Sequence, residues 1–146
     1  MVIDTNVLVY AADDAAPEQE RCRELVERCR ADSLPWFLTW GVVYEFLRVV
    51  THPRVLRQPR SVNEAWGFLT SLLASPTCTV LVATRRHVDV AGQVLSEHEG
   101  VLRGNLLHDA HTVVLMREHG VRQVATRDAD FHRFSSIEVI DPLAGP

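Results

Sequence analysis

The segment Val2-Ile3-Asp4-Thr5-Asn6-Val7-Leu8 opens with two apolar, β-branched residues, followed by a carboxylate, a hydroxyl and an amide group. Near the other end of the chain, Val124-Ala125-Thr126-Arg127-Asp128-Ala129-Asp130-Phe131 also passes from a short apolar stretch into polar side chains. Each segment is typical of a short buried strand that leads into a turn and a helix. We therefore expect Asp4 and Asp128 beyond the carboxyl ends of strands, where open α/β sheets bind ligands.

Between these segments, short apolar stretches alternate with longer amphipathic ones, which predicts an α/β/α sandwich with a short, mostly parallel central sheet. Strands are expected at 2–3, within 33–38, and at 79–82, 124–126 and 137–140; helices are expected at 5–12, 17–32, 40–50, 61–74, 84–99 and 105–119. Thr39, Ser61 and Thr84 are the expected N-caps of three helices, and Gly120 is expected to end the last one.

The composition is typical of a single globular domain, and we assign residues 1–146 to one domain. The chain has 146 residues, of which 47% are hydrophobic, and its net charge is −4. No apolar run approaches the roughly 18 residues of a membrane span. Val2 and Ile3 follow Met1 too closely for a signal peptide. We therefore expect a cytoplasmic protein with no membrane partner.

The basic residues and the cysteines exclude several classes of chemistry. All 15 basic residues are arginine, so P-loop enzymes and enzymes that form a Schiff base on lysine are excluded. Cys22 and Cys29 are seven residues apart on one expected helix, too far for a disulfide. We interpret these two and Cys78 as free thiols in or near the core.

Four carboxylates are candidates for one shared metal site: Asp4, Glu45, Asp109 and Asp128. Each has an ordinary alternative, because such residues also cap helices, face solvent, offset a helix dipole or form turns. A lone carboxylate beside apolar neighbours is costly to ionise. A hard divalent cation, Mg²⁺ or Mn²⁺, would account for all four together, since such ions prefer carboxylate oxygens.

The two end segments, with Glu45 in Trp40-Gly41-Val42-Val43-Tyr44-Glu45-Phe46-Leu47 and Asp109 in Leu106-Leu107-His108-Asp109-Ala110-His111, resemble PIN-domain ribonucleases. The resemblance is strongest to the VapC toxins of type II toxin–antitoxin systems and spans nearly the whole chain. It implies a PIN fold, a Mg²⁺ or Mn²⁺ requirement and a protein antitoxin as partner. It matches the acidic quartet to Asp4, Glu45, Asp109 and Asp128, the supporting polar positions to Asn6 and Thr126, and a variable, often acidic position to Asp130.

The expected activity is therefore that of a metal-dependent endoribonuclease, acting as a toxin, with tRNA or ribosomal RNA as the implied substrate. The cation would polarise a phosphate oxygen and lower the pKa of a water molecule. Two other functions stay open: a non-catalytic PIN-like module that binds RNA or protein, and a metal-dependent phosphatase. A zinc site is a further alternative, built from His108, Asp109 and His111 with His132 or His52.

Arginine is expected to bind the RNA, because its guanidinium group matches phosphate and stacks on bases. The candidates are Arg54, Arg57, Arg60, Arg85, Arg86 and Arg127. Solvated surface charge or antitoxin contacts are the alternative for each group.

Two interfaces are also expected. A broad apolar face indicates a homodimer and comprises Leu106, Leu107, Val113, Val114 and Leu115. An antitoxin segment is expected to cover a groove near Trp36, Phe37 and Trp40. We interpret these two tryptophans, together with Trp66, as core or interface residues rather than as base-stacking platforms.

Overall fold

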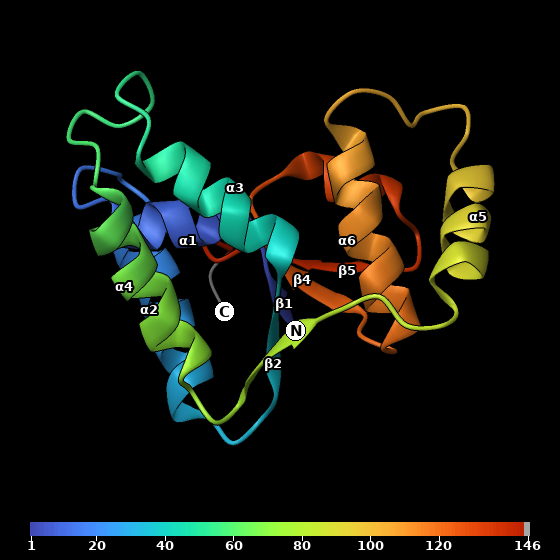
Figure 1. The fold of residues 1–146 in the computed structure, drawn as a ribbon, viewed down its shortest axis with the longest axis horizontal. Coiled ribbons are helices and arrows are strands. Elements are labelled where there is room, and N and C mark those ends of the chain that lie inside the picture. Colours follow the sequence, from blue (N-terminus) through green and yellow to red (C-terminus); the bar gives the residue numbers. More distant parts are fainter. Residues whose placement is uncertain (145–146) are drawn as a thin grey trace.

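The computed structural model describes residues 1–144, and its centre is a five-stranded sheet in which every pairing is parallel (Figure 1). The strand order is β3-β2-β1-β4-β5. The strands are β1 (Val2–Ile3), β2 (Trp36–Thr39), β3 (Cys78–Leu81), β4 (Gln123–Ala125) and β5 (Glu138–Ile140). The first strand of the chain therefore occupies the middle of the sheet.

Helices cover both faces of this sheet, which confirms the predicted α/β/α sandwich. On one face lie α1 (Thr5–Ala12), α2 (Gln19–Ala31), α3 (Trp40–Val50) and α4 (Val62–Leu73). On the other face lie α5 (His87–Glu97), α6 (Leu106–Glu118) and the short 3-10 helix η1 (Ala129–Arg133). Val2 and Ile3 alternate between the two faces, so each packs into a different core.

The register of the central strands brings the two end segments of the chain together. Ile3 on β1 pairs with Ala125 on β4, and the amide of Asp4 donates to the carbonyl oxygen of Ala125 at 3.0 Å. Asp4 and Thr126 thus leave the sheet side by side at its carboxyl edge. The parallel pairing of β1 with β4 therefore brings Asp4 next to Thr126, although the two residues are far apart in the sequence.

Hydrogen bonds at the caps confirm the expected starts of α1, α3 and α4. The side chain of Asp4 accepts from the amide of Thr5 at 2.7 Å, and that of Thr39 accepts from the amide of Val42 at 3.1 Å. Ser61 and Glu64 form a reciprocal capping box. Gly120 follows α6 with a φ of 69°, a backbone conformation in which glycine is favoured.

The prediction that Thr84 caps α5 is wrong, because α5 begins three residues later, at His87. Thr84 instead donates its amide and its hydroxyl to Glu118 of α6, at 2.9 and 2.6 Å. His87 Nδ1 lies 2.6 Å from the same carboxylate, whose side chain is fully buried. Glu118 therefore ties the loop between β3 and α5 to α6.

The apolar face assigned to a homodimer is mostly core. Leu106, Val113, Val114 and Leu115 are buried within the chain, and only Leu107 is exposed. A homodimer is still predicted, but the residues on which that prediction was based are mostly not available to form its interface. Among the tryptophans, Trp36 is buried, as expected for a core residue, so it is not available to line an antitoxin groove.

Two smaller findings complete the fold. Within residues 1–144, no helix is both long enough and apolar enough to cross a bilayer. Cys22, Cys29 and Cys78 are free thiols, as predicted.

We expect Glu118→Gln to lower the free energy of unfolding by about 1–3 kcal/mol at pH 7, because a buried carboxylate loses its charge-assisted hydrogen bonds. Burial opposes ionisation of Glu118, but hydrogen bonds from Thr84 and His87 outweigh it and lower its pKa to about 2. Because the folded-state pKa is depressed, this stabilisation is present above pH 4.5 and is lost as the pH falls towards 2. Urea unfolding of both proteins between pH 3 and pH 8 measures it.

The control is Glu24→Gln, which removes an exposed ion pair with Arg21 on α2. We expect that change to cost less than about 0.5 kcal/mol. Equal losses in the two variants would show that Glu118 does not anchor the loop.

Candidate active site

A cleft of about 1060 Å³ opens at the carboxyl edge of the sheet. Its walls come from α1, α3, α6 and the turn after β4. All four predicted acidic residues line it: Asp4, Glu45, Asp109 and Asp128. The fold therefore brings four carboxylates from separate parts of the chain to one hollow.

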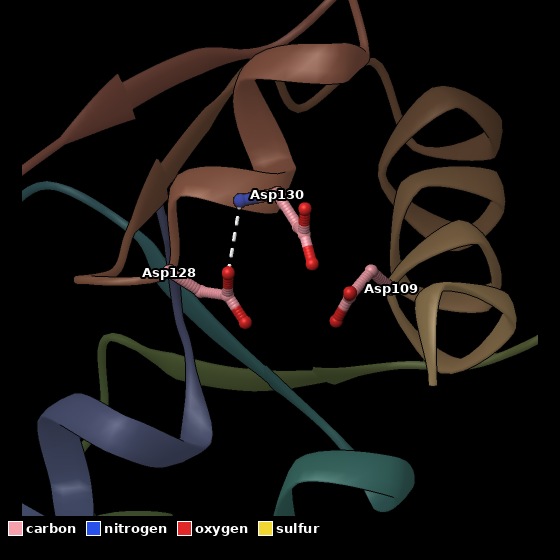
Figure 2. Close-up of side chains that lie close together, drawn as sticks. All are labelled: Asp109, Asp128 and Asp130. Atoms are coloured by element: carbon pink, nitrogen blue, oxygen red, sulfur yellow. Dashed lines mark hydrogen bonds between the residues drawn. The ribbon is translucent and has the colours of Figure 1, made fainter. Parts of the chain in front are cut away.

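The tightest group in the cleft contains three aspartates (Figure 2). Asp109 projects from α6 towards Asp128 and Asp130, which lie on the turn and first residues of η1. One carboxylate oxygen from each lies within 4.8 Å of the other two. Asp128 also accepts from the amide of Asp130 at 2.9 Å, which fixes the turn. Asp130, expected in a supporting position, thus belongs to the centre of the group.

Asp4 is held by uncharged donors. Thr126 Oγ1 and Asn6 Nδ2 donate to its Oδ2 at 2.6 and 2.7 Å. The same two side chains hold the neighbouring turn: Thr126 accepts from the amide of Asp128 at 2.9 Å, and Asn6 accepts from the amide of Arg127 at 3.0 Å. The structure thus places Asn6 and Thr126 where they orient Asp4 and the backbone that carries Asp128.

Glu45 lies on the exposed side of α3 and is joined to α1. Thr5 Oγ1 donates to Glu45 Oε2 at 3.2 Å, and Arg48 lies 3.3 Å from Oε1. Its side chain is 46% exposed. Glu45 therefore faces the cleft as a solvated carboxylate, whereas Asp4 beside it is largely buried.

Burial and the neighbouring carboxylates raise the pKa values of Asp109 and Asp4. Burial is the largest cause for Asp109, whose pKa rises to about 7, and repulsion from Asp4, Asp128 and Asp130 adds to it. Burial also raises the pKa of Asp4, and hydrogen bonds from Thr126 and Thr5 offset only part of the rise. The cleft therefore carries more negative charge than the protein itself balances.

Chemically, the cleft suits a hard cation. Three carboxylate oxygens from two elements converge, and three more carboxylates, those of Asp4, Asp13 and Glu45, line the same walls. Mg²⁺ and Mn²⁺ take oxygen ligands of this kind. The alternative of a zinc site is not supported, because in residues 1–144 the one group of three or more close His, Cys, Asp or Glu ligands is Asp109, Asp128 and Asp130.

The histidines of α6 nevertheless line the cleft. His108 and His111 are both in its wall, and the ring of His111 lies edge-on to that of His87, with centroids 5.8 Å apart. Burial and the nearby His87 and His108 lower the pKa of His111. A neutral imidazole beside the acids is thus favoured.

The arginine candidates separate into two groups. Arg60 donates to the carbonyl oxygen of Ala12, and Arg127 pairs with Glu18 and Asp141 at 3.4 and 3.5 Å, so these two are engaged within the fold. The RNA-binding role expected of Arg60 and Arg127 stays a prediction, and each side chain already has a partner within the fold.

The other candidates lie on exposed loops, and no ion pair within residues 1–144 involves them: Arg54, Arg57, Arg85 and Arg86. Val55 and Leu56 line the cleft, so the loop that carries Arg54 and Arg57 borders it. Arg54 and Arg57 are therefore exposed at the border of the cleft, and Arg85 and Arg86 are exposed on the loop before α5.

Several residues of the cleft were missed from the sequence. Arg48 follows Glu45 by three residues, which is the spacing of an ion pair on a helix and could have indicated it. Tyr10, Asp13 and Tyr44 also line the walls. Nothing in the local sequence separates these three from ordinary surface residues of a helix or turn.

Comparison with known proteins identifies the class that this fold and cleft define. The sequence model described as "PIN domain" matches residues 1–137, so the chain belongs to the PIN domain family. Ribonuclease VapC48 of Mycobacterium tuberculosis is 34% identical over 142 residues, which cover 97% of each chain.

Solved structures agree on the fold. A structure of VapBC2 from Rickettsia felis, bound to a promoter DNA fragment, superposes with a TM-score of 0.69 at 15% identity, covering 95% of this chain and 96% of that one. VapC20 of Mycobacterium tuberculosis, described as a "Sarcin-Ricin loop cleaving toxin", gives 0.65 at 17% identity, covering 90% of this chain and 92% of that one.

We expect Asp109→Asn to stabilise the metal-free protein at pH 8 by about 1–2 kcal/mol, a value reduced by the partial solvation of this carboxyl. Because folding raises the pKa of Asp109 from 3.8 to about 7, the folded state binds the proton more tightly. The wild-type protein therefore loses stability as the pH rises through this range, and the variant loses less, because only the raised pKa of Asp4 remains. Urea unfolding in EDTA from pH 4 to pH 8 measures the difference.

Asp89→Asn, an exposed acid on α5, is the matched control and should give no gain at any pH. Parallel stability curves for the wild type and Asp109→Asn would mean that no strained carboxyl exists at this position.

Proposed function

We propose that this chain is a metal-dependent endoribonuclease that acts as the toxin of a toxin–antitoxin pair, with residues 1–146 as one PIN domain. The observation that carries the proposal is the convergence of Asp4, Glu45, Asp109 and Asp128 in a single cleft. Membership of the PIN domain family and a full-length relative named as a ribonuclease support it.

The proposed cofactor is Mg²⁺ or Mn²⁺, held by Asp109, Asp128 and Asp130 with Asp4 and Glu45 beside them. A bound cation of this kind polarises a phosphodiester and lowers the pKa of a nearby water, so that hydroxide is available near neutral pH. The donor set fits, because every candidate ligand is a hard oxygen.

The residues around the acids position them. Thr126 and Asn6 fix the orientation of Asp4, and Thr5 fixes that of Glu45. Removing such orienting hydrogen bonds typically costs 10–100-fold in metal affinity or activity. Binding of the cation also favours the ionised form of Asp109, whose pKa is about 7 in its absence.

The proposed partners are a cognate antitoxin protein and RNA. A structural neighbour is a complex named VapBC2, and another is described as a toxin that cleaves the sarcin–ricin loop. We infer that tRNA or ribosomal RNA is the substrate, which places the activity in the cytoplasm. The exposed arginines Arg54, Arg57, Arg85 and Arg86 are proposed to contact its phosphates.

We expect Asp4→Asn to lower the rate of RNA cleavage at least about a hundredfold in saturating Mg²⁺, because the ligand set loses a negative charge. The fold should persist, since Asn keeps an oxygen that can accept from the amide of Thr5. Cleavage of total RNA, together with thermal unfolding, tests both statements.

The control Asp14→Asn changes an exposed acid in the turn after α1 and should cleave at the wild-type rate. A small phosphomonoester, offered to the wild type, should stay intact. Wild-type cleavage by a folded Asp4→Asn would contradict the proposed site, and rapid phosphomonoester hydrolysis would favour a phosphatase.

Arginine contacts to phosphate predict a specific change in salt dependence. For a double variant, Arg54→Gln with Arg57→Gln, we expect the slope of log affinity against log salt to flatten by about 1.4, because each lost contact releases about 0.7 fewer counterions from a single strand. Titration of a fluorescent RNA hairpin into the Asp4→Asn background measures the slope without cleavage.

Arg21→Gln with Arg30→Gln is the control, since both side chains pair with glutamates on α2. Its slope should equal that of the parent. An unchanged slope in the Arg54 and Arg57 variant would remove that loop from the RNA-binding surface.

A further inference from the structure

Two aromatic rings on α3 stand exposed beside the acidic cleft. Trp40 is 44% exposed and Tyr44, one turn further along, is 68% exposed. Their ring centroids lie 6.3 Å apart, with planes tilted by 44°. By contrast, Trp36 and Phe46, which flank this pair in the sequence, are buried. The exposed pair leaves apolar ring surface in water, and burial of that surface by a ligand is favourable.

The position of Tyr44 connects this pair to the acids. Tyr44 precedes Glu45 in α3, and both line the cleft that also contains Asp4 and Asp109. On the α6 side, His111 Nδ1 lies 4.0 Å from the place where a Cβ on Gly41 would stand, so the two walls approach each other at the first turn of α3. A planar group that lies on Tyr44 would therefore lie within the same cleft as the carboxylates.

The charge of the cleft determines which contacts can hold a substrate there. Arg48 on α3 and Arg133 on η1 already pair with Glu45 and Asp130 of the same elements. The excess of carboxylates repels phosphate. Attraction inside the cleft must therefore come from the proposed cation and from uncharged contacts. Stacking of a base on an aromatic ring contributes about 1–3 kcal/mol and does not depend on the sign of the surrounding charge.

We propose that Tyr44, supported by Trp40, stacks an unpaired base next to the phosphodiester that is cleaved. This inference rests on the proposed function and narrows its substrate to RNA with a base that is free of its helix. In a duplex the faces of each base are covered by its neighbours, so only a loop, bulge or flipped nucleotide can offer one to Tyr44. Tyr44 is thus a specificity residue, distinct from the carboxylates that position the cation.

The first experiment compares cleavage of a synthetic RNA hairpin with cleavage of the fully paired duplex of the same sequence. We expect the wild type to cut the hairpin in its loop and to leave the duplex intact. Tyr44→Phe keeps the ring and should stay within about twofold of the wild type. Tyr44→Leu keeps apolar volume without a planar face and should lose about tenfold or more in kcat/KM on the hairpin. Trp66→Leu, an exposed aromatic outside the cleft, is the control and should cleave normally.

A second measurement reads binding without catalysis. In the Asp4→Asn background with Mg²⁺, 2-aminopurine in the loop should be quenched on binding, and Tyr44→Leu should abolish the quenching while Tyr44→Phe preserves it. Light scattering of each variant reports its oligomeric state.

The outcomes separate the two proposals. If the wild type cleaves neither RNA with Mg²⁺ or Mn²⁺, the proposed function fails, and this inference fails with it. If the wild type cleaves the hairpin and Tyr44→Leu matches it in kcat/KM, the stacking role alone is wrong. A change of oligomeric state in Tyr44→Leu would assign the ring pair to an interface with a second copy and would also overturn the inference.

Discussion

Repulsion between carboxylates at the rim of a parallel sheet is the constraint on which the site depends. The carboxylates come from distant elements of the chain. Asp4 follows the central strand β1, Asp109 lies on α6, and Asp128 and Asp130 lie at the start of η1. The partners of Asp4 are uncharged: Thr126, Asn6 and the amide of Thr5. A buried carboxylate without a cationic partner is costly. Ionised Asp4 therefore destabilises the metal-free protein, and a divalent cation bound in the cleft would offset that free-energy cost.

The charges of the protein are unevenly distributed around this site. The centre of the cleft is acidic, while the exposed loop that carries Arg54 and Arg57 borders it. Under the proposed function, arginines at the border of the cleft, a cation at its centre and the exposed rings of α3 would share the attraction of the substrate. A net charge of −4 is compatible with the proposed RNA binding, because a cation bound in the cleft would compensate the carboxylates gathered there.

Much of this arrangement follows from the sequence. The apolar segments before Asp4 and Asp128 predicted that each aspartate follows a strand. In the structure, the parallel strand order β3-β2-β1-β4-β5 places these two aspartates at the same carboxyl edge of the sheet. Strand order itself is not encoded in local spacing, because it depends on which helices cover which face. The sequence also did not predict Asp130 at the centre, since a residue two positions beyond a strand can point either way until the turn of η1 fixes it. The partners of Arg60 and Arg127 within the fold were also not foreseen, because Ala12 and Glu18 are distant from them in the chain.

The anomalous scattering of crystals grown with saturating Mn²⁺ tests the proposed cation site most directly. A cation held by the carboxylates would give a strong peak in the cleft, about 2 Å from carboxylate oxygens of Asp109, Asp128 and Asp130 or Asp4. An empty cleft under these conditions, or a peak bound by His108 and His111 instead, would contradict it.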